Sequence, residues 1–198
     1  MKEELLKNGY ITFDIDTNHT ELNRIYTELI DNDKFNQLKI SYNDVSNNNN
    51  ATPFANFIQN EFEKNKLLNV DNLEQIWHWK QDQECYDLLY SIFKKFYDYD
   101  FDKLNIMSTL TLFTKGCFIN EHIDGRNKDR IAGILIYLNK NYNEENGGCL
   151  ILEDNTKIIP EYGRVVIIDY TQNSIKHSVT PIIENDRKAI CAFIHKKI

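Results

Sequence analysis

Histidine and aspartate side chains in the second half of the chain have the types and spacing of metal ligands. His122 and Asp124 are separated by one residue, and His177 follows the aspartate by 177 − 124 = 53 residues. Residues two apart on a β-strand point to one face, so a strand here would direct His122 and Asp124 to the same ion and Ile123 into the core. Two imidazoles and one carboxylate form a facial triad, which leaves coordination positions open on the metal.

An arginine near the carboxyl terminus indicates a second binding function. Arg187 lies ten residues after His177, past a turn. Its planar, always charged guanidinium is suited to hold a carboxylate through two hydrogen bonds. Taken singly, His177 fits a core histidine and Arg187 a strand-edge residue, but their joint spacing favours a site for a metal and an anion. Arg130 could contact substrate, but its position before the strand at 131–138 favours a surface salt bridge.

The elements that must position these side chains are short β-rich runs, which begin near residue 105. Turn signals such as Gly147-Gly148 separate the runs at intervals too short for crossover helices, so we expect antiparallel pairing. Eight strands of this kind predict a jelly roll. The expected strands are 106–114, 131–138, 149–153, 164–169, 178–183 and 189–194, with weaker ones at 118–123 and 156–159.

The first hundred residues are expected to be mainly helical. An apolar face with helical spacing follows Asp82, further helices are predicted at 20–29 and 54–67, and 10–13 is a candidate strand. We therefore expect one domain over residues 1–198, with a helical support region at 1–104 and a β core at 105–198.

Composition narrows the functional classes. The net charge of −7 disfavours nucleic acid as a partner, since phosphate backbones attract clustered lysine and arginine. The amino terminus lacks the apolar core of a secretory signal, and no stretch is apolar enough to span a membrane. The four cysteines are widely separated and fit packing in a reduced compartment, so a cytoplasmic location is expected.

Residues 112–195 resemble a known enzyme family, namely the prolyl 4-hydroxylase-related branch of the 2-oxoglutarate and iron(II) oxygenases, which includes the oxygen-sensing prolyl hydroxylases. The order and spacing of the motifs make this resemblance specific, and it covers roughly the last 85 residues. The first hundred residues resemble no family that we can name. The matching motifs are HID at 122–124, ILIYLN at 134–139, NGGCLIL at 146–152, IPEYGRVVIID at 159–169 and HSVTPIIENDR at 177–187.

The resemblance implies a fold and an activity. The fold is α+β or mainly β, with a double-stranded β-helix core (jelly roll, cupin-like) under an N-terminal helical layer. His122, Asp124 and His177 are implied as the catalytic residues that bind Fe(II), with Arg187 and Tyr137 on the distal carboxylate of 2-oxoglutarate. The implied enzyme is a dioxygenase that uses O2, with ascorbate as a possible further cofactor. It hydroxylates a C–H bond while 2-oxoglutarate is converted to succinate and CO2. Its substrate would be a protein prolyl residue or an amino acid-like small molecule.

The sequence departs from the family pattern at two positions, and two rival functions also remain as alternatives. Phe113 stands where the family often has a tyrosine, and Phe193 where the oxygen-sensing members have a tryptophan. The rivals are a non-catalytic metal-binding β-fold sensor and a zinc hydrolase that uses the same ligands. The complete ligand set disfavours the sensor, and Arg187 disfavours the hydrolase, because hydrolysis needs no co-substrate carboxylate. Asp124 argues against a halogenase, since halogenases vacate that position for halide.

Overall fold

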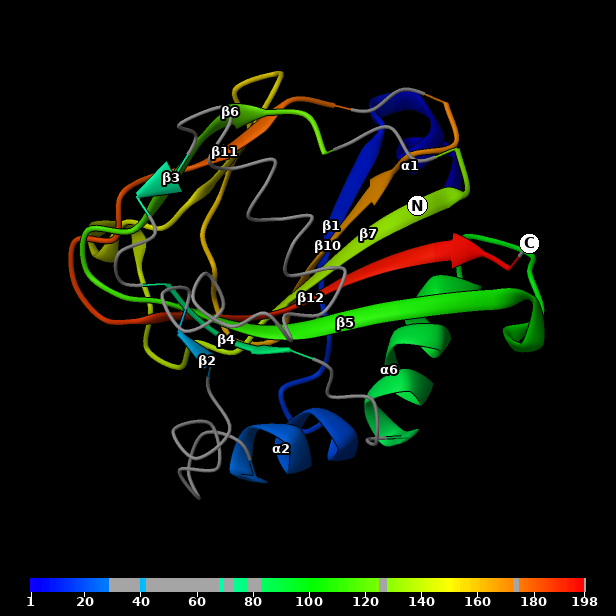
Figure 1. Cartoon of the computed structure of the whole chain (residues 1–198), viewed down its shortest axis with the longest axis horizontal. Coiled ribbons are helices and arrows are strands. Elements are labelled where there is room, and N and C mark those ends of the chain that lie inside the picture. The colour runs from blue at the N-terminus through cyan, green and yellow to red at the C-terminus, as the bar shows by residue number, and fades with distance from the viewer. Residues whose placement is uncertain are drawn as a thin grey trace, which may run out of the picture.

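The structure is a computed structural model that describes residues 1–28, 40–41, 68–69, 73–77, 83–124, 128–172 and 175–197. These residues form two antiparallel sheets, and helices pack against one of them (Figure 1). The two-sheet arrangement that the sequence predicts is therefore present.

The larger sheet has seven strands in the order β1-β10-β7-β12-β5-β4-β2, and every neighbouring pair is antiparallel. Its centre is the pair β12 and β5, which stay in register over ten residues. The strands are β1 (Tyr10–Asp14), β10 (Arg164–Asp169), β7 (Arg130–Tyr137), β12 (Arg187–Lys196), β5 (Leu104–Phe113), β4 (Leu73–Trp77) and β2 (Ile40–Ser41).

The smaller sheet has five strands in the order β3-β6-β11-β8-β9. Among the described residues from Leu104 onward, the chain thus forms eight strands, β5 to β12, which agrees with the predicted count. The strands of this sheet are β3 (Leu68–Asn69), β6 (Phe118–His122), β11 (His177–Val179), β8 (Leu150–Leu152) and β9 (Lys157–Ile158).

The apolar residues form two clusters, one on each face of the larger sheet. In β10, Val165 and Ile167 belong to a cluster shared with the helices, which we call the helix-side cluster. Val166 and Ile168 point the other way, into a cluster shared with the smaller sheet, which we call the inter-sheet cluster. Alternate strand residues point to opposite faces, so an uninterrupted apolar strand such as β10 is buried on both.

Helix α6 (Gln83–Lys94) supplies most of the helical contribution to the helix-side cluster. The apolar face that the sequence predicts after Asp82 is confirmed, because its residues are all at most 2% exposed. They are Cys85, Leu88, Leu89, Ile92, Phe93 and Phe96. The other helices are α1 (Lys2–Asn8), α2 (Thr20–Tyr26), η2 (Phe101–Lys103) and η3 (Glu144–Asn146). None of the described helices has both the length and the apolar character for crossing a bilayer.

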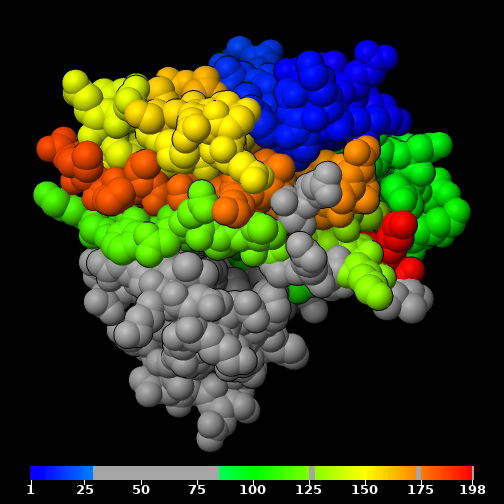
Figure 2. Space-filling model, turned by 90° about the horizontal axis from the view of Figure 1, so that it is seen from above, coloured from blue at the N-terminus to red at the C-terminus, as the bar shows by residue number. Residues whose placement is uncertain are grey.

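The amino-terminal region differs in part from the predicted helical layer. β1 confirms the candidate strand at 10–13, whereas β2, β3 and β4 were not predicted, and β1, β2 and β4 extend the larger sheet. Helix α2 corresponds to the predicted helix 20–29, whereas 54–67 lies outside the described residues. The first residues (blue) pack beside the segment near residue 150 (yellow) in Figure 2, where the Tyr10 hydroxyl lies 2.7 Å from Asp154 Oδ2.

Candidate metal centre

The two histidines face each other across neighbouring strands of the smaller sheet. β11 pairs antiparallel with β6, and His177 is directly opposite His122 in the register, with ring centroids 4.3 Å apart. The register shifts between His177 and Val179, because β6 has one more residue than β11 between their partners Ile119 and His122. Such irregularities re-aim side chains beside functional sites. The sheet register thus unites two residues that are 55 positions apart (177 − 122).

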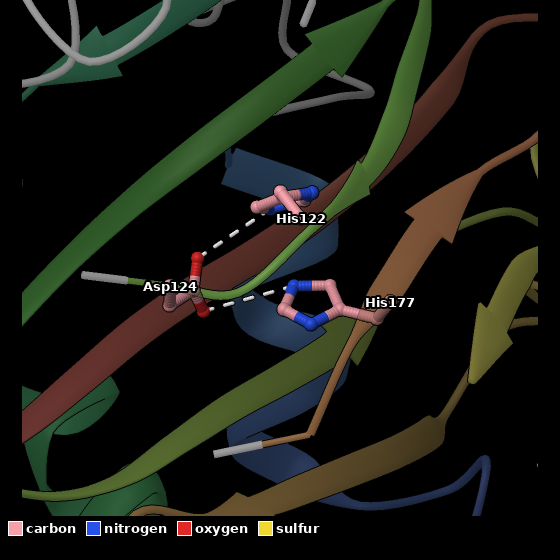
Figure 3. A group of neighbouring side chains, drawn as sticks. All are labelled: His122, Asp124 and His177. Atoms are coloured by element: carbon pink, nitrogen blue, oxygen red, sulfur yellow. Dashed lines mark ion pairs between the residues drawn. The ribbon is translucent and has the colours of Figure 1, made fainter. Parts of the chain in front are cut away.

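Asp124 completes the group from the loop that follows β6 (Figure 3). Its Oδ1 lies 3.6 Å from His122 Nε2, and its Oδ2 lies 3.7 Å from His177 Nε2. Metal bonds to such atoms are about 2.1 Å long, so one ion can bridge either of these two pairs of atoms. The ligand atoms of the three residues all lie within 4.8 Å of one another. The predicted cluster is therefore brought together.

The way in which Asp124 reaches the cluster differs from the prediction. β6 ends at His122, so Asp124 lies beyond the strand rather than on it. Ile123 is 39% exposed, so the prediction that its side chain points into the core is wrong. The chain leaves the sheet immediately after His122, and strand alternation no longer fixes where the next side chains point.

Each imidazole donates a hydrogen bond from one ring nitrogen, and the other ring nitrogen of the neutral ring is available to bind a metal. His122 Nδ1 lies 2.8 Å from the Asn120 carbonyl oxygen, and His177 Nδ1 lies 3.2 Å from the Ile175 carbonyl oxygen. A carbonyl only accepts, so each Nδ1 carries the proton and donates it, and each Nε2 keeps its lone pair. Metal-binding histidines typically have this arrangement. The donor set therefore fits a divalent transition metal.

The electrostatics of the cluster favour the metal-binding protonation states of Asp124 and His177, whereas the pKa of His122 is raised, because the effect of burial is outweighed by its hydrogen bonds to Asp124 and to the Asn120 carbonyl oxygen. Burial alone would raise the pKa of Asp124, but His122, His177 and a tyrosine hydroxyl together lower it well below its ordinary value. Burial lowers the pKa of His177, with Asp124 opposing. At neutral pH the carboxylate is thus charged and His177 is neutral, which metal coordination requires.

A second group lies where β7, β12 and β5 run side by side in the larger sheet. Arg187 is 2% exposed, its Nε donates to the Gly148 carbonyl oxygen at 3.0 Å, and its Nη2 donates to the Tyr137 hydroxyl at 3.2 Å. Its guanidinium carbon lies 5.2 Å from the centre of the Phe113 ring. Within the described part of the chain, Arg187 has no carboxylate partner. A buried cation of this kind needs an anion, and a bound carboxylate would supply it.

For one nearby residue the prediction from the sequence is wrong, and for another the sequence analysis makes no prediction. Arg130 is 6% exposed, and its guanidinium carbon lies 4.0 Å from the centre of the Phe193 ring, so the surface salt-bridge interpretation is wrong. Tyr170 was not singled out, yet its hydroxyl donates to Asp124 Oδ2. One signal for it exists in the sequence: Gly133, alone inside a strand, marks a close approach by another group.

Sequence comparison matches residues 107–195 to a family model described as the 2OG-Fe(II) oxygenase superfamily. The matched segment contains the whole candidate centre, from β5 to β12. A search of curated proteins finds no match.

Comparison with solved structures finds several prolyl hydroxylases. A Pseudomonas putida prolyl-4-hydroxylase has a TM-score of 0.67 at 15% identity, with 100% of this chain and 97% of that chain covered. A Trichoplax adhaerens prolyl hydroxylase, in complex with a hypoxia inducible factor peptide fragment, has a TM-score of 0.65 at 18% identity, covering 98% and 87%. A viral collagen prolyl hydroxylase from Paramecium Bursaria Chlorella virus-1, in a 2OG complex, has a TM-score of 0.53 at 19% identity, covering 72% and 89%. These likenesses show the fold, which is the predicted double-stranded β-helix.

Proposed function

We propose that this chain, whose residues 107–195 belong to the 2OG-Fe(II) oxygenase superfamily, is a 2-oxoglutarate-dependent dioxygenase with its iron on His122, Asp124 and His177. The observation that carries the proposal is the convergence of two Nε2 lone pairs and one carboxylate in a single cluster. A hard carboxylate with two imidazoles is the ligand set of non-haem Fe(II) oxygenases. The family implies Fe(II), 2-oxoglutarate and O2.

The residues proposed to bind iron and those proposed to bind the distal carboxylate of 2-oxoglutarate form two separate groups. His122, Asp124 and His177 would hold Fe(II) on one side only, which leaves room for co-substrate and O2. Bound iron and 2-oxoglutarate would couple decarboxylation to succinate and CO2 with transfer of one oxygen atom from O2 to a substrate C–H bond. The pKa of Asp124 is lowered beside both imidazoles, so its carboxylate is charged at neutral pH and has no proton to lose before it binds metal.

Arg187 and Tyr137 would bind the distal carboxylate of 2-oxoglutarate. The guanidinium of Arg187, which has no carboxylate partner among the described residues, supplies charge and a planar fork of donors. Burial raises the pKa of Tyr137, so its hydroxyl remains protonated and can donate to an anion. The same buried cation separates this proposal from a zinc hydrolase, because a hydrolase would leave Arg187 without a partner. The complete ligand cluster likewise disfavours a non-catalytic sensor.

The proposed substrate is a prolyl residue of a protein or an amino acid-like small molecule. Support comes from the prolyl hydroxylases that share the fold, one of which was solved with a peptide. A screen of proline-containing peptides and free amino acids for a mass gain of one oxygen atom would identify the substrate.

The test of the proposed function is succinate formation. Protein loaded anaerobically with Fe(II) and then given 2-oxoglutarate and O2 should form succinate, slowly even without substrate. Asp124→Ala should reduce the rate to background, because the metal loses its only carboxylate ligand. The matched control is Glu121→Ala, which removes an exposed carboxylate next to the cluster that, among the described residues, forms an ion pair with Lys176 alone; this variant should retain the activity. Equal succinate formation by Asp124→Ala and the unaltered protein would sink the proposal.

A further inference from the structure

The second oxygen of Asp124 has a partner of its own. Tyr170 is the first residue after β10, and its hydroxyl donates to Asp124 Oδ2. Asp124 Oδ2, which lies 3.7 Å from His177 Nε2, is therefore also the acceptor of a hydrogen bond from Tyr170.

The structure keeps a space for the Tyr170 ring. A Cβ at position 133 would lie 3.1 Å from Tyr170 Cε2 and 3.3 Å from its hydroxyl oxygen, which is tighter than ordinary packing. Gly133 therefore lets the ring cross the middle of β7. The guanidinium carbon of Arg130 lies 5.4 Å from the centre of the Tyr170 ring, and the centre of the Phe193 ring lies 6.5 Å from it. The ring therefore packs among Gly133, Arg130 and Phe193.

The backbone at Tyr170 is also fixed. Its N–H donates to the Ile131 carbonyl oxygen at 2.9 Å, which continues the pairing of β10 with β7. The preceding residue, Asp169, is 1% exposed and accepts hydrogen bonds from the Tyr97 hydroxyl and from Thr171. These hydrogen bonds and the packing of the ring together place the Tyr170 hydroxyl against Asp124.

We propose that Tyr170 is a positioning residue that makes Asp124 a ligand through one oxygen. The inference rests on the proposed function. A carboxylate can bind a metal through one or both oxygens, and binding through both would fill a position that 2-oxoglutarate or O2 needs. Because the Tyr170 hydroxyl engages Oδ2, Asp124 offers Oδ1 to the metal. The phenol also fixes the rotamer of a side chain that stands on a loop rather than in a strand.

The test measures Co(II) binding under anaerobic conditions, by calorimetry and by the visible absorption of the bound ion. Tyr170→Phe keeps the ring and removes the hydroxyl. Loss of a partner to a metal ligand typically weakens metal binding by about 10–100-fold, so we expect a rise of this size in the Kd for Co(II). The absorption spectrum should also change, because its intensity reports the coordination number of the ion.

A second variant approaches the same contact from the other side. Gly133→Ala keeps the Tyr170 hydroxyl group but forces the ring, and the hydroxyl with it, to shift from the new Cβ, so it should also weaken Co(II) binding. Combining it with Tyr170→Phe should add little, since both changes break one interaction. The matched control is Tyr162→Phe, whose hydroxyl donates to Asn23 Oδ1 at 2.8 Å, and which should bind Co(II) like the unaltered protein. Thermal unfolding of each metal-free variant shows that it is folded.

The outcomes separate this inference from the function on which it rests. If Tyr170→Phe binds Co(II) with unchanged affinity and spectrum while Asp124→Ala loses binding, the role of Tyr170 is overturned and the metal centre stands. If the unaltered protein binds no Co(II), or binds it equally well after Asp124→Ala, both proposals fall.

Discussion

At the scale of the residue, Arg187 shows how much one buried side chain determines. Its Nε and Nη2 are used by Gly148 and Tyr137, and its face lies against Phe113. These contacts hold the guanidinium plane in a single orientation, so little freedom is left to lose when an anion binds. Phe113 thus contributes an aromatic face to the arginine and no polar contact.

Arg187→Lys should weaken 2-oxoglutarate binding. Lysine keeps the charge but loses the planar fork and the bond to Gly148. Hydrogen bonds to charged groups contribute about 1.5–3 kcal/mol, so the KM for 2-oxoglutarate should rise by about 10–150-fold, measured from succinate formation. Tyr137→Phe should raise it by a smaller factor. Arg164→Lys, at a surface arginine that pairs with Asp14 and Glu161, is the control and should leave the KM unchanged. An unchanged KM in Arg187→Lys would mean that the co-substrate binds elsewhere.

At the scale of the element, the turn before β8 ties together the strands that carry the site. Gly147 pairs with Ile182 in an isolated bridge, and Gly148 N–H donates to the Pro181 carbonyl oxygen at 3.2 Å. Gly147 has φ 75° and ψ −152°, a conformation that only glycine adopts readily. The turn thus fixes β8 to the loop that leads into β12 and to Arg187.

Gly147→Ala should destabilise the protein more than Gly116→Ala. Both glycines have positive φ, for which alanine costs about 1–2 kcal/mol. A Cβ at Gly147 would lie 2.0 Å from the Pro181 carbonyl oxygen, whereas one at Gly116 would meet nothing within 4 Å. Because backbone cannot move aside as a side chain can, we expect about 1–3 kcal/mol of additional loss at Gly147. Urea unfolding measures both, and equal losses would show that the turn rearranges freely.

The elements also show what the sequence could predict. β10 and the buried face of α6 were found because burial on two faces, or along one helical face, leaves a clear apolar pattern. β2 and β4 join the sheet edge through backbone pairing, which leaves little trace in side-chain types. The ligand cluster was predictable from motif spacing. Tyr170 was not, because its contact spans 170 − 124 = 46 residues and depends on how β7 and β10 lie together.

At the scale of the whole molecule, the two apolar clusters divide the protein into parts that the metal should affect differently. His122 and His177 lie on strands of the smaller sheet, which packs on the larger sheet through the inter-sheet cluster. Helix α6 lies against the opposite face, in the helix-side cluster. Metal binding therefore joins β6, β11 and the loop of Asp124 directly, and reaches α6 only through the larger sheet.

Co(II) should therefore slow amide hydrogen exchange in β6 and β11 much more than in α6. A ligand present at 100 times its Kd stabilises the form that binds it by about 2.7 kcal/mol, so amides exposed by opening of the site should exchange up to about 100-fold more slowly. Amides of α6 that exchange through local opening need not release the metal, so their rates should stay the same. Mass spectrometry of peptides from both regions measures this, with Asp124→Ala as the control that shows no metal effect. Equal protection of α6 and the histidine strands would mean that the two faces of the sheet open together, and that the centre stabilises the molecule only as a whole.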